Sequence, residues 1–153
     1  MLSVGKTDED FYVRAIEMFK KRLSHYIPFE LDFVPDVKNR KNLSEKEQKQ
    51  LEGEAILNRI QPGDHVVLLD DKGKQYSSME FSAFIEKRSH SVPKRLVFVV
   101  GGPYGFADQV YDRANEKLSL SRMTFTHQMV RLVFVEQLYR AMTILNGEPY
   151  HHE

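Results

Sequence analysis

The chain of 153 residues contains no cysteine. This absence excludes a disulfide scaffold, a thiolate zinc site and catalysis by a cysteine nucleophile. The sequence also lacks an apolar run long enough to cross a bilayer, which takes about 20 residues, and we therefore expect a cytoplasmic protein with no membrane partner. Two catalytic signatures are missing as well: the Gly-x-Ser-x-Gly elbow of serine hydrolases and the Gly-Lys-Ser/Thr ending of a phosphate-binding loop.

An excess of charge of one sign is also absent. Lys+Arg and Asp+Glu both number 22, so the formal net charge at pH 7 is +0. This balance argues against a protein that captures free nucleic acid through bulk charge. Three local basic runs remain, at 20–22, 38–41 and 87–88; runs of this kind are more often solvated faces of helices and loops than binding patches.

The patterned segments predict one domain over residues 1–153, with strands and helices in alternation. Hydrophobic residues make up 41% of the chain, enough for a globular core. Thr7 is a suitable N-cap for a first helix, and two capping boxes, Ser44–Glu47 and Ser77–Glu80, predict two further helix starts. Strands are predicted at 29–33, 65–69 and 96–100, and helices at 107–116 and 127–146. This order predicts an α/β fold with a largely parallel sheet flanked by helices.

A glycine turn marks the candidate ligand site. The apolar run Leu96–Val100 leads directly into Gly101-Gly102-Pro103-Tyr104-Gly105-Phe106. Paired glycines allow a ligand to approach the backbone closely, and turns at the carboxyl ends of strands are where open α/β sheets bind ligands. The glycine spacing does not match the dinucleotide fingerprint. We therefore expect a small-molecule site at this turn.

Few other residues suggest chemistry by themselves. His151 and His152 are adjacent and have no carboxylate at a familiar zinc spacing, so we expect no metal site. Asp70 and Asp71 precede Lys-Gly and are typical of a turn over 70–73. Glu136 and Arg140, four residues apart, indicate an ordinary surface ion pair.

Four segments together resemble a known family. They are Gly101–Gly105, Ser119–Arg131, Glu136–Ala141 and Pro149–His151, and weaker similarity extends over the whole chain, including Val4-Gly5-Lys6 and Leu68-Leu69-Asp70. The chain resembles the ribosomal RNA large subunit methyltransferase H family, a minimal member of the SPOUT class. The resemblance implies a C-terminal trefoil knot, a homodimer, and S-adenosylmethionine-dependent methylation of N3 of a pseudouridine in 23S rRNA.

The resemblance also implies a set of cofactor-binding residues. They are mainly apolar residues and backbone amides, which suit an adenine held in an apolar slot: Leu69, Gly101, Gly102, Leu120, Ser121, Arg122, Met123, Thr124 and Phe125.

The catalytic roles stay open among four residues. A general base, or a group that stabilises the pseudouridine anion, would be His127, Tyr150 or His151, with Arg131 neutralising charge or holding phosphate. Tyr150 and His151 belong to the tail after the last helix, which we expect to act on RNA within an assembled ribosomal particle rather than in folding, and in a dimer to reach the partner's pocket. The main alternative function is a non-catalytic RNA- or ribosome-binding factor. A second is a small nucleotide-binding α/β enzyme of another type that uses the glycine turn for phosphate.

Overall fold

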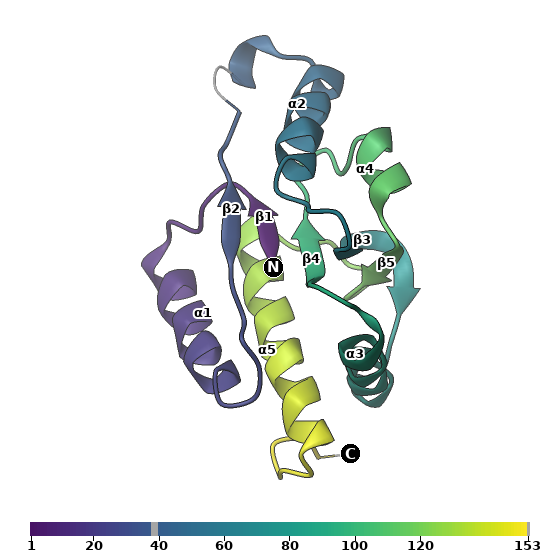
Figure 1. Ribbon diagram of the computed structural model, residues 1–153. Coiled ribbons are helices and arrows are strands. Elements are labelled where there is room, and N and C mark those ends of the chain that lie inside the picture. The colour runs from purple at the N-terminus through teal and green to yellow at the C-terminus, as the bar shows by residue number, and fades with distance from the viewer. Residues whose placement is uncertain (38–39, 153) are drawn as a thin grey trace.

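The computed structural model describes residues 1–37 and 40–152, and in that part of the chain one sheet of five parallel strands forms the centre (Figure 1). The strand order is β2-β1-β4-β3-β5. The bounds are Leu2–Val4 (β1), Asp32–Val34 (β2), His65–Gln75 (β3), Leu96–Val100 (β4) and Glu116–Ser119 (β5). Every pairing is parallel, which confirms the predicted α/β class. The trefoil knot stays a prediction.

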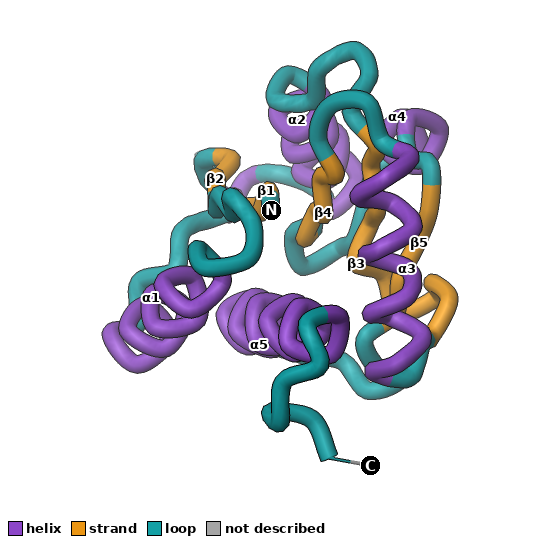
Figure 2. The backbone as a smooth tube through the Cα atoms, turned by 60° about the horizontal axis from the view of Figure 1, so that its bottom comes forward, coloured by secondary structure: helices purple, strands orange, loops and turns teal. Residues whose placement is uncertain are grey.

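Helices cover both faces of the sheet, as Figure 2 shows. Helices α1 (Asp10–Leu23), α3 (Ser78–Ser91) and α5 (His127–Leu145) lie on one face, and α2 (Glu45–Leu57) and α4 (Asp108–Arg113) lie on the other; a 3-10 turn, η1, spans Arg40–Asn42. Because successive side chains of a strand point to opposite faces, the sheet has a hydrophobic core on each face. Val67 and Phe98 face α1, α3 and α5, whereas Val66, Leu68 and Val99 face α2 and α4.

The helix starts follow local sequence where side chains can cap them. Both predicted capping boxes are present. The hydroxyls of Ser44 and Ser77 accept from the N–H groups of Glu47 and Glu80, and each glutamate carboxylate accepts in turn from the N–H of its N-cap serine. Thr126 caps α5, its hydroxyl accepting from the Met129 N–H at 3.3 Å. Each such cap contributes about 1 kcal/mol.

The start of α1 differs from the prediction. Glu9, not Thr7, is the N-cap residue, and its side chain makes no cap bond. Instead, the Oε1 of Gln128, at the start of α5, accepts from the N–H groups of Asp8 and Glu9 at 3.1 and 3.2 Å. Gln128, which is 120 positions from Asp8 in the chain, therefore takes the place of a local cap.

Three predicted boundaries were wrong: those of the strand 29–33, of the turn 70–73 and of the helix 107–116. Pairing between strands explains each of them. The strand predicted at 29–33 is Asp32–Val34, because only those residues find partners on the short β1. The turn predicted at 70–73 is instead part of β3, whose register on β5 shifts between Leu69 and Lys74. Gly73 permits this shift, since a Cβ there would lie 2.6 Å from the Leu118 backbone.

The predicted helix 107–116 stops at Arg113. Asn115 then bonds to the β3 edge, its N–H donating to the Val66 carbonyl at 2.9 Å and its Oδ1 accepting from the Val66 N–H at 2.8 Å. This double contact starts β5, a strand that periodicity did not predict. The last helix, predicted at 127–146, is confirmed within one residue.

Candidate functional site

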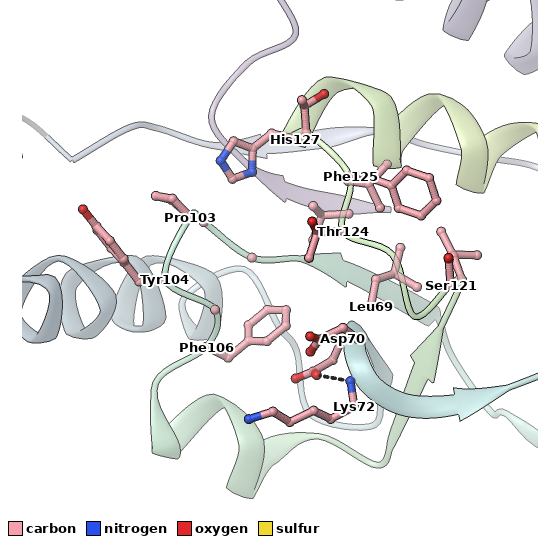
Figure 3. Close-up of a pocket in the computed structure, with 18 of the residues that line it drawn as sticks. Leu69, Asp70, Lys72, Pro103, Tyr104, Phe106, Ser121, Thr124, Phe125 and His127 are labelled. Carbon is pink, nitrogen blue, oxygen red and sulfur yellow. Dashed lines mark hydrogen bonds between the residues drawn. The ribbon is translucent and has the colours of Figure 1, made fainter.

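A pocket of about 720 Å³ lies at the carboxyl ends of β4 and β5, beside residues 69–72 in the middle of β3 (Figure 3). Three segments form most of it: residues 69–72, residues 100–106 and the stretch from Leu118 to Val130. This size is within the usual range of about 300–1,000 Å³ for small-molecule sites. The edge of the sheet is the one at which parallel α/β folds bind ligands, as the glycine turn predicted.

The structure brings nearly all the expected cofactor residues together. Those that line the pocket are Leu69, Gly101, Gly102, Leu120, Ser121, Met123, Thr124 and Phe125. Arg122 is the exception: it is exposed and lies outside the lining. Met123 and Phe125 are also exposed, at 77% and 39%, so the loop before α5 presents apolar side chains at the mouth of the pocket.

Buried side chains pack closely against the glycine turn. A Cβ on Gly101 would lie 3.0 Å from the Phe106 ring, and a Cβ on Gly102 would lie 2.1 Å from the Oε2 of Glu52. Glu52 is itself only 3% exposed and accepts a hydrogen bond from the Gln48 side chain at 2.8 Å. The turn therefore has no room for side chains at these two positions.

Asp70 is a pocket residue rather than a simple turn residue. Its Oδ2 accepts from the Tyr111 hydroxyl at 2.5 Å, and its Oδ1 accepts from the Lys72 N–H at 2.8 Å. Burial acts to raise the pKa of Asp70, but these hydrogen bonds outweigh it and hold the pKa below its usual value. Burial and the neighbouring Asp70 carboxylate raise the pKa of Tyr111. At neutral pH the pair is therefore a carboxylate bonded to a protonated phenol.

His127, the first residue of α5, lines the pocket and is exposed. Figure 3 shows its imidazole on the same side of the pocket as Thr124 and Pro103. Of the four candidate catalytic residues, it is the one that the structure places in the pocket of its own chain.

Arg131 lies one helical turn further along α5, and the structure places it in the interior. It is 1% exposed. Its guanidinium donates to the Ser3 hydroxyl at 2.7 Å, the Val4 carbonyl at 2.6 Å and the Thr7 hydroxyl at 2.9 Å. These bonds join β1 to α5, so the side chain is committed to the fold and does not line the pocket.

Tyr150 and His151 lie at the other end of α5, a helix about 28 Å long at 1.5 Å per residue. The Tyr150 ring packs edge-on against Tyr139 at 4.8 Å and under the Arg140 guanidinium at 4.8 Å. Its hydroxyl donates to Glu136 at 3.1 Å, and Arg140 lies 3.4 Å from the His151 ring nitrogen. These contacts hold the tail against α5, and our expectation that it acts in the RNA site rather than in folding stays a prediction.

The same contacts change the interpretation of Glu136 and Arg140. They do form the predicted ion pair, at 2.7 Å, but they are half-buried and also hold the tail. Burial and the neighbouring Glu136 carboxylate raise the pKa of Tyr150. The Tyr150 phenol therefore keeps its proton and acts as a donor.

Several pocket residues were missed from the sequence. They are Asp70, Asp71, Lys72 and Tyr111. The signal available for Asp70 and Lys72 was their position directly after the predicted strand 65–69. Tyr111 carried no such signal, because it reaches Asp70 from helix α4, 41 residues away.

Residues of two of the three basic runs form ion pairs. Lys20 pairs with Glu17, and Arg88 pairs with Glu116. Part of the third run, 38–41, lies outside the described residues.

Within residues 1–37 and 40–152, no group of three or more His, Asp or Glu side chains is arranged to hold a metal ion. In the same residues, no helix has the length and apolar character needed to cross a membrane.

Known proteins similar to this chain match it over nearly its full length. A family model described as a predicted SPOUT methyltransferase matches residues 1–151. The chain is 64% identical over 153 residues to ribosomal RNA large subunit methyltransferase H of Parabacteroides distasonis, covering 100% of this chain and 98% of the relative. Identity to proteins of the same name is 58% in Phocaeicola vulgatus and 56% in Porphyromonas gingivalis W83, with the same coverage.

Proposed function

Because this chain belongs to the SPOUT methyltransferase family, we propose that it methylates large-subunit ribosomal RNA, at N3 of a pseudouridine, with S-adenosylmethionine as methyl donor. The observation that carries the proposal is the pocket: the cofactor-binding residues implied by the resemblance, Arg122 apart, converge there from three separate segments. A non-catalytic ribosome-binding factor would need no such pocket, and relatives that share this chain's full length are named as methyltransferases.

The pocket fits S-adenosylmethionine in size and in chemistry. Its apolar members, among them Leu69, Leu120 and Phe106, offer an adenine slot, and Gly101 and Gly102 expose backbone to the ligand. The bound cofactor would supply an activated methyl group. The chain's own part is to place the target nitrogen in line with that methyl group and to exclude water.

The proton on N3 must be accepted as the methyl group is transferred. Tyr150 is unsuited to be the base, since its phenol is held protonated beside Glu136. His127 stands in the pocket and His151 lies against Arg140. We therefore assign proton acceptance to an imidazole.

The site is composite across a homodimer in this proposal. Tyr150 and His151 lie at the far end of α5 from the pocket of their own chain, as Figure 1 shows for the C-terminus, so a partner subunit must bring them to the reaction. Helices α1 and α3 of the same chain cover part of α5. The half-buried remainder of the helix, including Leu132 and Val133, is left for the partner to bury.

Complementation in mixed dimers tests this arrangement. One variant lacks residues 149–153, and the other carries Gly101→Val, which places a branched side chain against Phe106 in the pocket. Each homodimer should be nearly inactive. A mixed population should regain activity, because one of its two sites combines an intact pocket with an intact tail. No recovery, in a mixture shown to exchange subunits, would place tail and pocket in one chain and refute the composite site.

The substrate we propose is RNA within an assembled particle, in the cytoplasm. The formal net charge of +0 gives the protein no general affinity for free RNA, so the particle must supply shape and additional contacts. Methyl transfer to intact ribosomes, to large subunits and to protein-free rRNA should be compared at one salt concentration. Equal rates on free RNA and on particles would contradict this part, while titration of S-adenosylmethionine tests the cofactor separately.

A further inference from the structure

Asp70 places an ionised carboxylate inside the cofactor pocket. Figure 3 shows it between Leu69 and Lys72, on the wall that faces Thr124. Both of its oxygens already accept one hydrogen bond, from Tyr111 and from the Lys72 backbone. The side chain is therefore fixed in one orientation, and each oxygen keeps a lone pair for a further donor.

Carboxylates outnumber ammonium groups in the lining of the pocket. Asp70 and Asp71 line it together with one ammonium group, that of Lys72, and the imidazole of His127. Asp70 forms none of the described ion pairs, and the Lys117 ammonium acts on it through space, favouring its ionised form. A half-buried carboxylate in such a position exerts a stronger field on a nearby ligand than it would in bulk water.

The cofactor and its product differ in charge. S-adenosylmethionine carries a sulfonium, an ammonium and a carboxylate, for a net charge of +1, whereas the demethylated product has lost the sulfonium charge and is neutral overall. A carboxylate in the pocket wall favours the first over the second. That preference helps the product leave when the methyl group has been transferred.

We propose that Asp70, held by the Tyr111 hydroxyl, is a specificity-determining residue that makes the pocket prefer the cationic methyl donor over the neutral product. This inference rests on the proposed function. A purely structural role for Asp70, tying α4 to β3 through Tyr111, predicts equal losses of affinity for both compounds, and the two roles are therefore separable by experiment.

The test compares the full-length protein with Asp70→Asn, which keeps the shape and one of the two acceptor oxygens but removes the charge. Calorimetry measures the Kd of S-adenosylmethionine and of S-adenosylhomocysteine for both proteins. We expect the ratio of the product Kd to the donor Kd to fall by about fivefold in Asp70→Asn. Sinefungin, which has an amine in place of the methylsulfonium, should follow the donor.

Two further variants make the outcome decisive. Tyr111→Phe removes the hydroxyl donor and keeps the ring, so it should reduce the same ratio less than Asp70→Asn does. Glu86→Gln removes an exposed carboxylate on α3 and should leave the ratio unchanged.

An unchanged ratio in a folded Asp70→Asn protein would overturn the inference while leaving the proposed function intact. If the unmodified protein bound neither compound, the proposed function itself would fail.

Discussion

Adding one methyl group at Gly102 should disturb the pocket more than its size suggests. A Cβ at this position would lie 2.1 Å from the Oε2 and 2.7 Å from the Cδ of Glu52, so the loop or the carboxylate must move by about 1 Å to reach normal contact. Glu52 cannot move freely, because it is buried and bonded to Gln48. Helix α2 is also fixed nearby, since Gly53 packs closely on Ala107 of the segment before α4.

The glycine turn must therefore shift outward into the pocket. Overpacking of this kind costs about 1–3 kcal/mol, and each kcal/mol lowers the melting temperature by about 3 °C in a chain of this length. Gly102→Ala should accordingly melt about 3–9 °C lower and bind S-adenosylmethionine more weakly. Thermal unfolding and calorimetry measure the two effects.

A double-mutant cycle identifies the cause. Glu52→Asp shortens the opposing side chain by one methylene, so Gly102→Ala should cost less in that background, with a coupling of about 1 kcal/mol or more. Gly101→Ala is the matched control: its Cβ would meet Phe106, at 3.0 Å, and its cost should be the same with Glu52 or Asp at position 52. Equal costs of Gly102→Ala in both backgrounds would refute the reasoning.

Three further predictions concern the framework around the pocket. Arg131→Lys should lower stability by about 2–4 kcal/mol, because the lysine cannot replace all three bonds of a buried guanidinium; folded enzyme that kept full activity per molecule would confirm a structural role, and a selective loss of kcat would support the catalytic one. Thr126→Ala removes the α5 cap and should cost about 1 kcal/mol in denaturant unfolding. The hydrogen bond from Arg95 holds the pKa of Asp64 below its usual value, so its contribution to stability is complete above the ordinary aspartate pKa and is lost as pH falls through the lowered one. Asp64→Asn should therefore flatten the acid limb of the stability–pH curve, and an unchanged limb would contradict this assignment.

Local sequence determined those features whose causes lie within a few residues of one another. The capping boxes at Ser44 and Ser77, the run Leu96–Val100 and the long α5 each follow from short-range hydrogen bonding or hydrophobic periodicity. The glycine turn also marked the edge of the sheet where the pocket lies, since Gly101 and Gly102 follow a buried strand directly. The motif resemblance added the identities of most of the lining residues.

Tertiary structure decided what depends on partners distant in the chain. Arg131 is buried because β1 offers it a carbonyl and two hydroxyl groups lie beside it, more than 120 residues away, and periodicity along α5 cannot show them. Tyr111 reaches Asp70 on β3 from helix α4, and pairing with β3 turned the end of a predicted helix into β5. The tail is held by side chains that it meets only after α5 has formed. In each case the burial of a polar group or a strand edge selects the partner, and that selection is made in three dimensions.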